Sequence, residues 1–204
     1  MRENFSAVKR SLSHEGKSSN LEYKEPSKGC KEMARNKKIS AMMAVSLFGV
    51  LALAPAASAA TPTYLTTTQR AQLKYLIEEE KLARDVYTYL AGKVTTRKFS
   101  NIARSEQTHM NYVASLLAKY KQTNPTTGKA AGVFVNKDIQ ALYNTLIAEG
   151  AAGQLQAFAV GVKVEQVDIA SIKELLLKPM PADVKAALDL MLAASNTHLE
   201  AFTY

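Results

Sequence analysis

The stretch that decides the fold is NIARSEQTHMNYVASLLAKY, residues 101–120. Side chains at steps of three and four form one stripe, the core-facing pattern of an amphipathic helix. Two positions of that stripe, one turn apart, are a carboxylate (Glu106) and an imidazole (His109). Burying an ionised carboxylate is costly unless it is paired or bound to a cation. Alone, this helix is compatible with a solvated Glu106 beside a core histidine or with a pair of metal ligands.

The rest of the chain downstream of residue 60 shows the same helical period, and no segment has the alternation of a strand. We predict long helices at 67–91, 101–121, 152–167 and 181–202, a shorter one at 137–149, and one or two further turns at 171–177. Polar residues that can cap the first three helices are Thr66 with Gln69, Ser100 and Asn136.

The fold class that follows is all-α. Four long amphipathic helices predict an antiparallel bundle. The connection between the second and third is about thirty residues long and contains a helix of its own, whereas links in a simple up-down bundle have ~2–8 residues. One long crossover therefore predicts a ferritin-like four-helix bundle, with a helix-containing crossover between helices two and three.

Each long helix carries a charged or imidazole side chain within its apolar stripe, and three carboxylates facing one core repel each other unless a cation lies among them. In the third helix, for example, the expected stripe is Leu155, Phe158, Val162, Glu165 and Ile169. With two imidazoles, the carboxylates form an oxygen and nitrogen shell suited to iron, manganese or zinc. The predicted metal ligands are Glu80, Glu106, His109, Glu165 and His198.

These residues carry a resemblance. The segment Glu80-Lys-Leu-Ala-Arg84-x-x-Tyr87 is similar to the first helix of rubrerythrin-like proteins, and Glu106-x-x-His109 matches their second-helix motif. More closely, the chain resembles the ferritin-like family called domain of unknown function 2202 over about residues 66–203, in segments 78–87, 99–110, 165–169 and 198–202. The resemblance implies a ferritin-like bundle and a metal centre, here two iron ions, but it brings no established reaction.

The last helix departs from a full di-iron pattern, which has a second Glu-x-x-His. This chain has Ser195-Asn-Thr-His198. Asp168, one turn after Glu165, can replace the absent carboxylate, or Ser195 can hold a water molecule. Because the second ion has fewer anionic ligands, we expect one tightly bound and one weakly bound metal per chain.

Other polar residues of the first helix have two interpretations each. Tyr87 either hydrogen-bonds a ligand or packs with its hydroxyl satisfied elsewhere. Arg84 either pairs with a ligand carboxylate or forms an ordinary ion pair on the helix surface. Glu78 and Glu79 are expected to face solvent.

The N-terminal part predicts export. Residues 33–40 are basic, residues 41–53 are thirteen apolar or small residues, and residues 55–59 are small, which is the order of a secretory signal peptide cleaved near Ala59. The apolar run is too short for a comfortable membrane span, so no stable span is expected after cleavage. Residues 1–32 are predicted to be a disordered extension or a mis-assigned start, and residues 60–204 the bundle domain.

Charge and cysteine content narrow the function. The chain has 26 basic and 18 acidic residues, but residues 1–59 hold 10 and 5 of them, which leaves a net charge of only about +3 in residues 60–204. Those residues contain no basic cluster with interleaved aromatics, so nucleic-acid binding is not expected. The only cysteine, Cys30, precedes the predicted cleavage point, so stability must come from packing or metal.

We therefore expect an exported metal-binding protein, with oxidase, peroxidase or iron-handling activity. The alternative is an exported helical module, for interaction or structure, whose metal site is degenerate or purely structural. The metal, any reaction and the assembly state stay open, and a homo-oligomer is compatible with the sequence.

Overall fold

The computed structural model describes residues 64–203. Within them the chain forms five helices and no strand, so the all-helical prediction is confirmed there; the predicted signal peptide and the preceding residues 1–32 lie outside the described part. The helices are α2 (Thr67–Ala91), α3 (Lys98–Lys119), α4 (Lys137–Gly150), α5 (Gln154–Leu176) and α6 (Ala182–Thr203). None of these helices is both long enough and apolar enough to cross a membrane.

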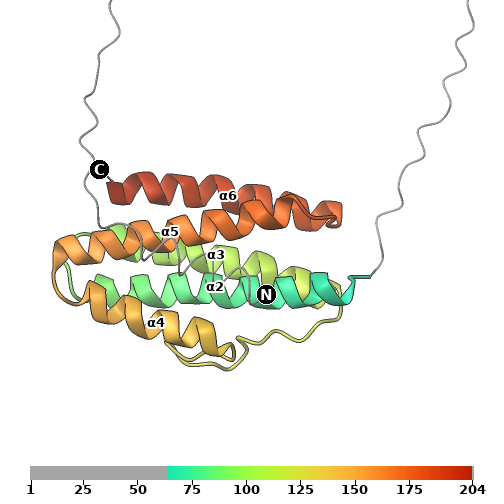
Figure 1. The fold of residues 1–204 in the computed structure, drawn as a ribbon, viewed down its shortest axis with the longest axis horizontal. Coiled ribbons are helices and arrows are strands. Elements are labelled where there is room, and N and C mark those ends of the chain that lie inside the picture. Colours follow the sequence, from blue (N-terminus) through green and yellow to red (C-terminus); the bar gives the residue numbers. More distant parts are fainter. Residues whose placement is uncertain (1–63, 204) are drawn as a thin grey trace, which may run out of the picture. The chain divides into compact units, whose positions relative to one another are not determined.

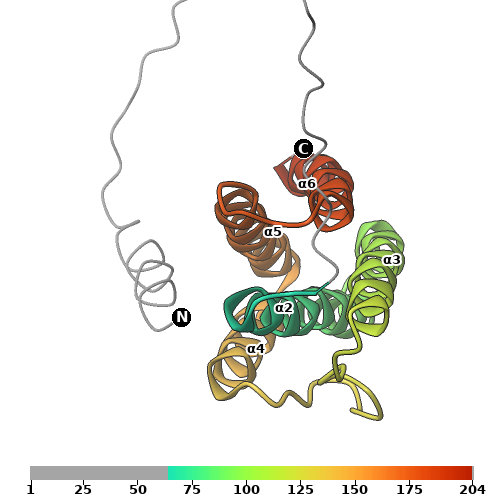
Figure 2. The same cartoon turned by 90° about the vertical axis from the view of Figure 1, so that its right-hand side faces the viewer.

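Four of the helices enclose a common interior (Figures 1 and 2). Helix α2 packs on α3 and α5, and α6 packs on the same two helices, so α2, α3, α6 and α5 form a closed ring. Helix α4 lies outside this ring against α2 and α5. Helices α3 and α5 run in the same direction (Figure 1), because the long connection between them, which contains α4 as predicted, returns the chain to its starting end.

Two predicted helix caps are present. The backbone N–H of Gln69 donates to Thr66 Oγ1 (3.2 Å), and the backbone N–H of Thr66 donates to Gln69 Oε1 (2.8 Å), which is a complete capping box at the start of α2. At the start of α4, the Asn136 side chain accepts from the backbone N–H groups of Asp138 and Ile139. Both caps satisfy donors that a helix end leaves free.

The predicted start of the second helix was wrong. Helix α3 begins at Lys98, and the hydroxyl of Ser100 lies inside its first turn, where it donates to the Arg97 carbonyl (3.0 Å). The hydroxyl of Thr96 accepts from the backbone N–H of Lys98 (3.2 Å) instead. The residue at the N-cap position is Arg97, whose side chain makes no capping hydrogen bond.

Helix α5 corrects two further predictions. It is continuous from Gln154 to Leu176, so 152–167 and 171–177 are not separate segments; Ser171 stays helical and donates to Glu79 Oε2 (2.7 Å). Of the predicted stripe, Glu165 and Ile169 are buried and Phe158 and Val162 are partly buried, but Leu155 is 81 % exposed. The residues that α5 buries are Ala157, Val160, Gly161, Val164, Glu165, Asp168, Ile169, Ile172 and Leu175.

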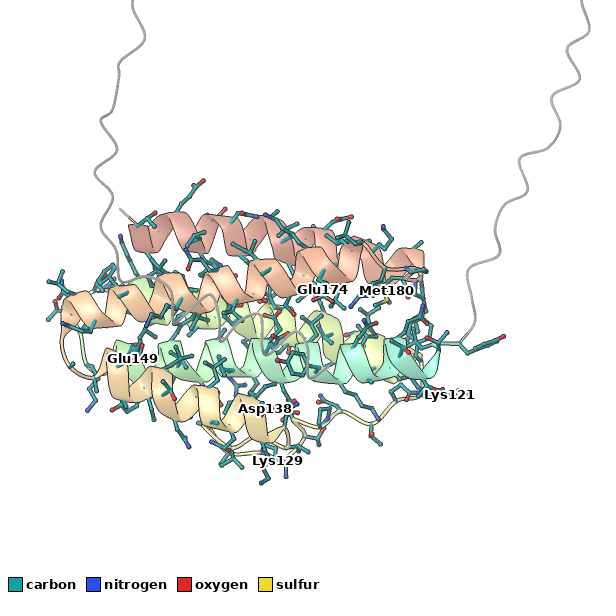
Figure 3. The ribbon with its side chains drawn as sticks, in the orientation of Figure 1. Lys121, Lys129, Asp138, Glu149, Glu174 and Met180 are labelled. Atoms are coloured by element: carbon teal, nitrogen blue, oxygen red, sulfur yellow. The ribbon has the colours of Figure 1, made fainter. Side chains whose placement is uncertain are left out.

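A polar layer divides the interior into two apolar clusters. We call them the Tyr87 cluster, which includes Tyr87, Phe99 and Phe202, and the Leu188 cluster, which includes Leu73, Leu117 and Leu188. Along each ring helix, residues of one cluster precede the polar positions and residues of the other follow them. Charged side chains such as Lys129 and Glu149 lie on the outside of the molecule (Figure 3).

Candidate metal centre

The five predicted ligands meet in the polar layer. They come from all four ring helices and are at most 8 % exposed, His198 being the most accessible. The stripes of α2, α3 and α6 point inward as predicted, which places Glu80, the Glu106–His109 pair and His198. Glu165 is buried as predicted, although Leu155 at the start of its predicted stripe is exposed.

The first group of ligand atoms joins α2 to α3. Nδ1 of His109 lies 3.2 Å from Glu80 Oε2 and 2.8 Å from Glu106 Oε2. The His109 ring therefore turns the same nitrogen toward two carboxylates. One oxygen from each acid and this nitrogen lie within 4.8 Å of one another.

The second group joins α3 to α5 and α6. Nδ1 of His198 lies 2.8 Å from Glu106 Oε1 and 3.6 Å from Glu165 Oε2, and one ligand atom from each of the three residues lies within 4.8 Å of the others. Glu106 belongs to both groups and presents one oxygen to each imidazole. The rings of His109 and His198 are stacked, with centroids 5.7 Å apart.

Several atoms of this layer have no hydrogen-bond partner within residues 64–203. They are Glu80 Oε1, both carboxylate oxygens of Glu106, Glu165 Oε2, Asp168 Oδ1 and His198 Nδ1. His198 Nδ1 is close to Glu106 Oε1, but the pair lacks the angles of a hydrogen bond, as expected of two groups aimed at a common point. Because buried polar atoms are nearly always partnered, this concentration of unpartnered carboxylate oxygens beside two imidazoles fits a bound cation.

The pKa values of the acids show how strongly they interact. Burial, with the charges of Asp168 and Glu106, raises the pKa of Glu80 well above its usual range. Burial, with the charge of Glu106, raises the pKa of Glu165 to about 8, against the opposing effect of His198. These two carboxyls therefore keep protons that a cation would displace.

Glu106 behaves in the opposite way. Burial raises its pKa, but the two imidazoles outweigh burial and bring the pKa to about 2. Burial lowers the pKa of His198, whereas its contacts with Glu106 and Glu165 raise it to about 10. Glu106 is thus the one carboxylate of the layer held ionised by both histidines, as a ligand shared between two ions would be.

Tyr87 both packs in the core and hydrogen-bonds a predicted ligand. Its fully buried ring contacts Phe99 and Phe202, and its hydroxyl donates to Glu165 Oε1 (2.6 Å). The hydroxyl is also 3.3 Å from the carbonyl of Gly161. Tyr87 therefore fixes the orientation of Glu165 and leaves Oε2, the oxygen nearer His198, free.

Arg84 pairs with no predicted ligand, and its ion pair with the buried Asp85 is not a surface pair either. Its guanidinium donates to Asp85 Oδ1 (2.6 and 2.9 Å) and to Gln107 Oε1 (2.6 Å). These contacts hold α2 against α3 on the outer side of the layer. Arg84 is thus a helix-packing residue beside the centre.

Asp168 and Ser195 also lie in the layer. Both are buried, and the Ser195 hydroxyl donates to Asp168 Oδ2 (2.6 Å). Burial and the charge of Glu106 raise the pKa of Asp168 to about 6, while the bond from Ser195 lowers it.

Buried charges on the outer side of α2 were missed by sequence analysis. Glu78 was expected to face solvent, but it is 5 % exposed and accepts from the backbone N–H groups of Val135 and Asn136. Lys81 and Asp85 form a buried ion pair. Lys81 donates to the Ala130 carbonyl (2.8 Å). The four-residue spacing of Lys81 and Asp85 is compatible with an ion pair on a helix, but nothing in it shows that the connection before α4 covers the pair.

The described residues are those of an all-helical protein with a buried layer of carboxylates and histidines. The chain belongs to the family described as "Uncharacterized protein domain (DUF2202)", whose model matches residues 69–204. The sequence-based resemblance to that family is confirmed.

A relative from Methanocaldococcus jannaschii, "Uncharacterized protein MJ0754", is 40 % identical over 125 residues, which are 61 % of this chain and 68 % of that protein. The solved structure described as "Crystal structure of hypothetical protein MJ0754 from Methanococcus jannaschii DSM 2661" matches with a TM-score of 0.67 at 36 % identity. The match covers 69 % of this chain and 81 % of that one. The fold described here is therefore similar to one found by crystallography.

Proposed function

We propose that this chain is an exported ferritin-like protein whose ring helices form a four-helix bundle around a di-iron carboxylate site. The observation that carries the proposal is the set of buried, unpartnered carboxylate oxygens facing two imidazoles. The parallel direction of α3 and α5, with a long connection between them, supports the ferritin-like connectivity.

Two ions fit the ligand set. Glu80 and His109 would hold one, Glu165 and His198 the other, and Glu106 would contribute one oxygen to each. Carboxylates and imidazoles in this combination suit iron, with manganese or zinc as chemically related occupants. Bound iron would supply the electron-transfer chemistry of an oxidase, a peroxidase or an iron-handling protein.

The surrounding residues prepare the ligands for this role. The Tyr87 cluster and the Leu188 cluster keep water from both sides of the layer, which strengthens every electrostatic interaction within it. Tyr87 orients Glu165, and two histidines keep Glu106 ionised. The protons held by Glu80 and Glu165 would leave as the ions enter, so binding should be tighter at higher pH.

A purely structural metal is the second candidate. It is favoured by the burial of all five ligands and by Ser195 at the position where a full di-iron pattern has a carboxylate. In that case the ions would hold the four helices together without a reaction, as structural metals do in other small domains.

The metal claim is tested by elemental analysis of the full chain after loading with Fe(II) without oxygen. Wild type should retain two ions per chain, and His109→Ala should lose at least one because it removes the nitrogen of the first group. Thr108→Ala is the matched control, since Thr108 is the exposed neighbour on the same helix. Equal metal content in wild type and His109→Ala would contradict the assignment.

Consumption of oxygen and of peroxide by the ferrous protein distinguishes a redox role of the metal from a purely structural role. Consumption in proportion to bound iron, abolished in His109→Ala, supports the redox role. Bound metal that leaves oxygen and peroxide untouched supports the structural role.

Export is proposed from the signal-like order of residues 33–59. N-terminal sequencing of protein recovered outside the cytoplasm should begin near Ala60. A cytoplasmic protein that retains Met33 would contradict export without affecting the metal site.

A further inference from the structure

The position of Ser195 in α6 raises the question of what replaces the missing carboxylate. Ser195 is fully buried, one turn before His198 and on the same inward face. Directly across from it on α5 lies Asp168, one turn after Glu165 and only 6 % exposed. The hydroxyl and the carboxylate occupy one location in the layer, reached from two different helices.

The contact fixes one oxygen of Asp168 and leaves the other free. Ser195 Oγ lies 2.6 Å from Asp168 Oδ2 and 2.9 Å from the Met191 carbonyl. A hydroxyl has one proton to donate, and a bond to a carboxylate is the stronger of the two. Asp168 Oδ1 is buried with no hydrogen-bond partner among the described residues.

The free oxygen belongs to the layer of predicted ligands. The charge of Asp168 raises the pKa of Glu80, and the charges of Glu106 and His109 act in turn on the pKa of Asp168. Asp168 therefore interacts electrostatically with the first group of ligand atoms, although it follows Glu165 of the second group on its own helix.

We propose that Asp168 is a sixth metal ligand and that Ser195 positions it, so that the carboxylate absent from α6 is supplied from α5. This inference rests on the proposed metal centre. Under it, the gap that Ser195 leaves on α6 is filled by a carboxylate from α5.

Charge supports the assignment. Two divalent cations bring four positive charges into a buried layer in which Glu80, Glu106 and Glu165 provide three negative ones. Asp168 is the remaining acid of the layer and brings the formal charge to zero. Uncompensated charge in such an interior is strongly unfavourable.

The rival explanation is that Asp168 is a buried acid satisfied by Ser195, with no contact to metal. Asp168→Asn separates the two. Asparagine keeps the shape and an oxygen that accepts from Ser195, but it lacks the charge of a ligand carboxylate. Melting curves in chelator establish that each variant is folded before metal is added.

Anaerobic titration of the full chain with Fe(II) against a chelator of known affinity measures the effect. Asp168→Asn should weaken one ion by roughly a hundredfold. Ser195→Ala removes only the positioning bond and should weaken it by roughly tenfold, within the ~10–100-fold range for residues that orient a ligand. Affinity equal to wild type in Asp168→Asn would overturn the inference.

A swap of the carboxylate sharpens the test. Ser195→Glu alone should bring no gain, because its acid would face Asp168. In the Asp168→Ala background the same substitution should recover most of the lost affinity. The Glu side chain would extend from position 195, whose hydroxyl contacts Asp168 in wild type, toward the space that Asp168 leaves. The effect of Ser195→Glu thus depends on the residue at position 168, and a double-mutant cycle measures this coupling directly.

Tightening by tenfold or more from Ser195→Glu in both backgrounds would show that Asp168 is no ligand. If wild type itself binds no Fe(II), the proposed function fails and takes this inference with it. If wild type binds two ions and Asp168→Asn binds both with the affinity of wild type, only the inference fails.

Discussion

The same four helices form the two apolar clusters and the polar layer between them, and inward residues recur at the same three- and four-residue steps in all three. The clusters and the layer nevertheless affect the stability of the fold in opposite ways. In α2 the inward stripe passes from Leu76 through Glu80 to Ala83 without a change of helical phase. The apolar clusters stabilise the fold by burial. The layer buries carboxylates that repel one another. Stability and chemistry are thus carried by successive turns of the same helices.

The largest expected effect is in the Leu188 cluster. Leu117→Ala removes a side chain with no exposed surface and should lower the free energy of unfolding by ~2–5 kcal/mol. The loss should be the same with metal and in chelator, because Leu117 is outside the layer. Urea denaturation is the measurement. Leu190→Ala, at a position 60 % exposed, is the control and should change stability by less than about 0.5 kcal/mol.

The contribution of the polar layer to the stability of the fold should depend on pH. In the folded, metal-free chain Glu165 keeps its proton to about pH 8 and Asp168 to about pH 6, above their unfolded values of 4.5 and 3.8. The folded state therefore binds more protons in this range, and its stability should fall as pH rises from about 4 to 8. The raised pKa of His198, about 10 against 6.5, extends the fall above pH 8.

Urea denaturation in chelator at several pH values checks this dependence. Metal affinity should change in the opposite sense and increase with pH, because protons compete with the ions. A metal-free stability that rises steadily between pH 5 and pH 8 would contradict the protonation assigned to the layer.

The Tyr87 cluster should be sensitive to added volume. A Cβ at Gly161 would lie 2.7 Å from the ring of Phe202, so α5 approaches α6 closely at this point. Gly161→Ala should cost ~1–3 kcal/mol by overpacking, measured by thermal unfolding. Gly92→Ala is the matched control, because a Cβ there meets only the Tyr89 carbonyl at 3.5 Å.

The smallest effect is expected outside both regions. Thr66→Ala removes half of the capping box of α2 and should cost ~1 kcal/mol, visible in the same thermal experiment. Metal content should be unchanged, since the cap is four turns from Glu80. A loss of metal in this variant would indicate that the layer depends on the end of the helix.

How much was predictable from the sequence differs between the helices. Helices α2 and α6 alternate apolar and polar residues clearly, so their inward faces, including Glu80 and His198, followed from periodicity alone. Helix α5 is apolar on most sides, with Leu155 exposed and Val164 buried. Periodicity indicates only the approximate buried face of such a helix, and packing against α2, α4 and α6 decides which residues are fully buried.

The candidate site shows the same limit. Its five ligands were found because each interrupts a stripe of hydrophobic residues. Asp168 was recognised only as a substitute, since its contact with Ser195 depends on how α5 and α6 face each other. The burial of Lys81 and Asp85 was not predicted, because the segment that covers them, before α4, has no periodic pattern.

The central claim is that the polar layer binds metal and is stabilised by it. The most direct measurement is the melting temperature of the full chain in excess Fe(II), without oxygen, and in chelator. A ligand that binds only the folded state adds about 2.7 kcal/mol at a hundredfold excess over Kd. For a chain of this size that raises the melting temperature by roughly 5–10 °C. We expect this rise in wild type and its loss in His109→Ala; equal melting temperatures of wild type with metal and with chelator would contradict the account.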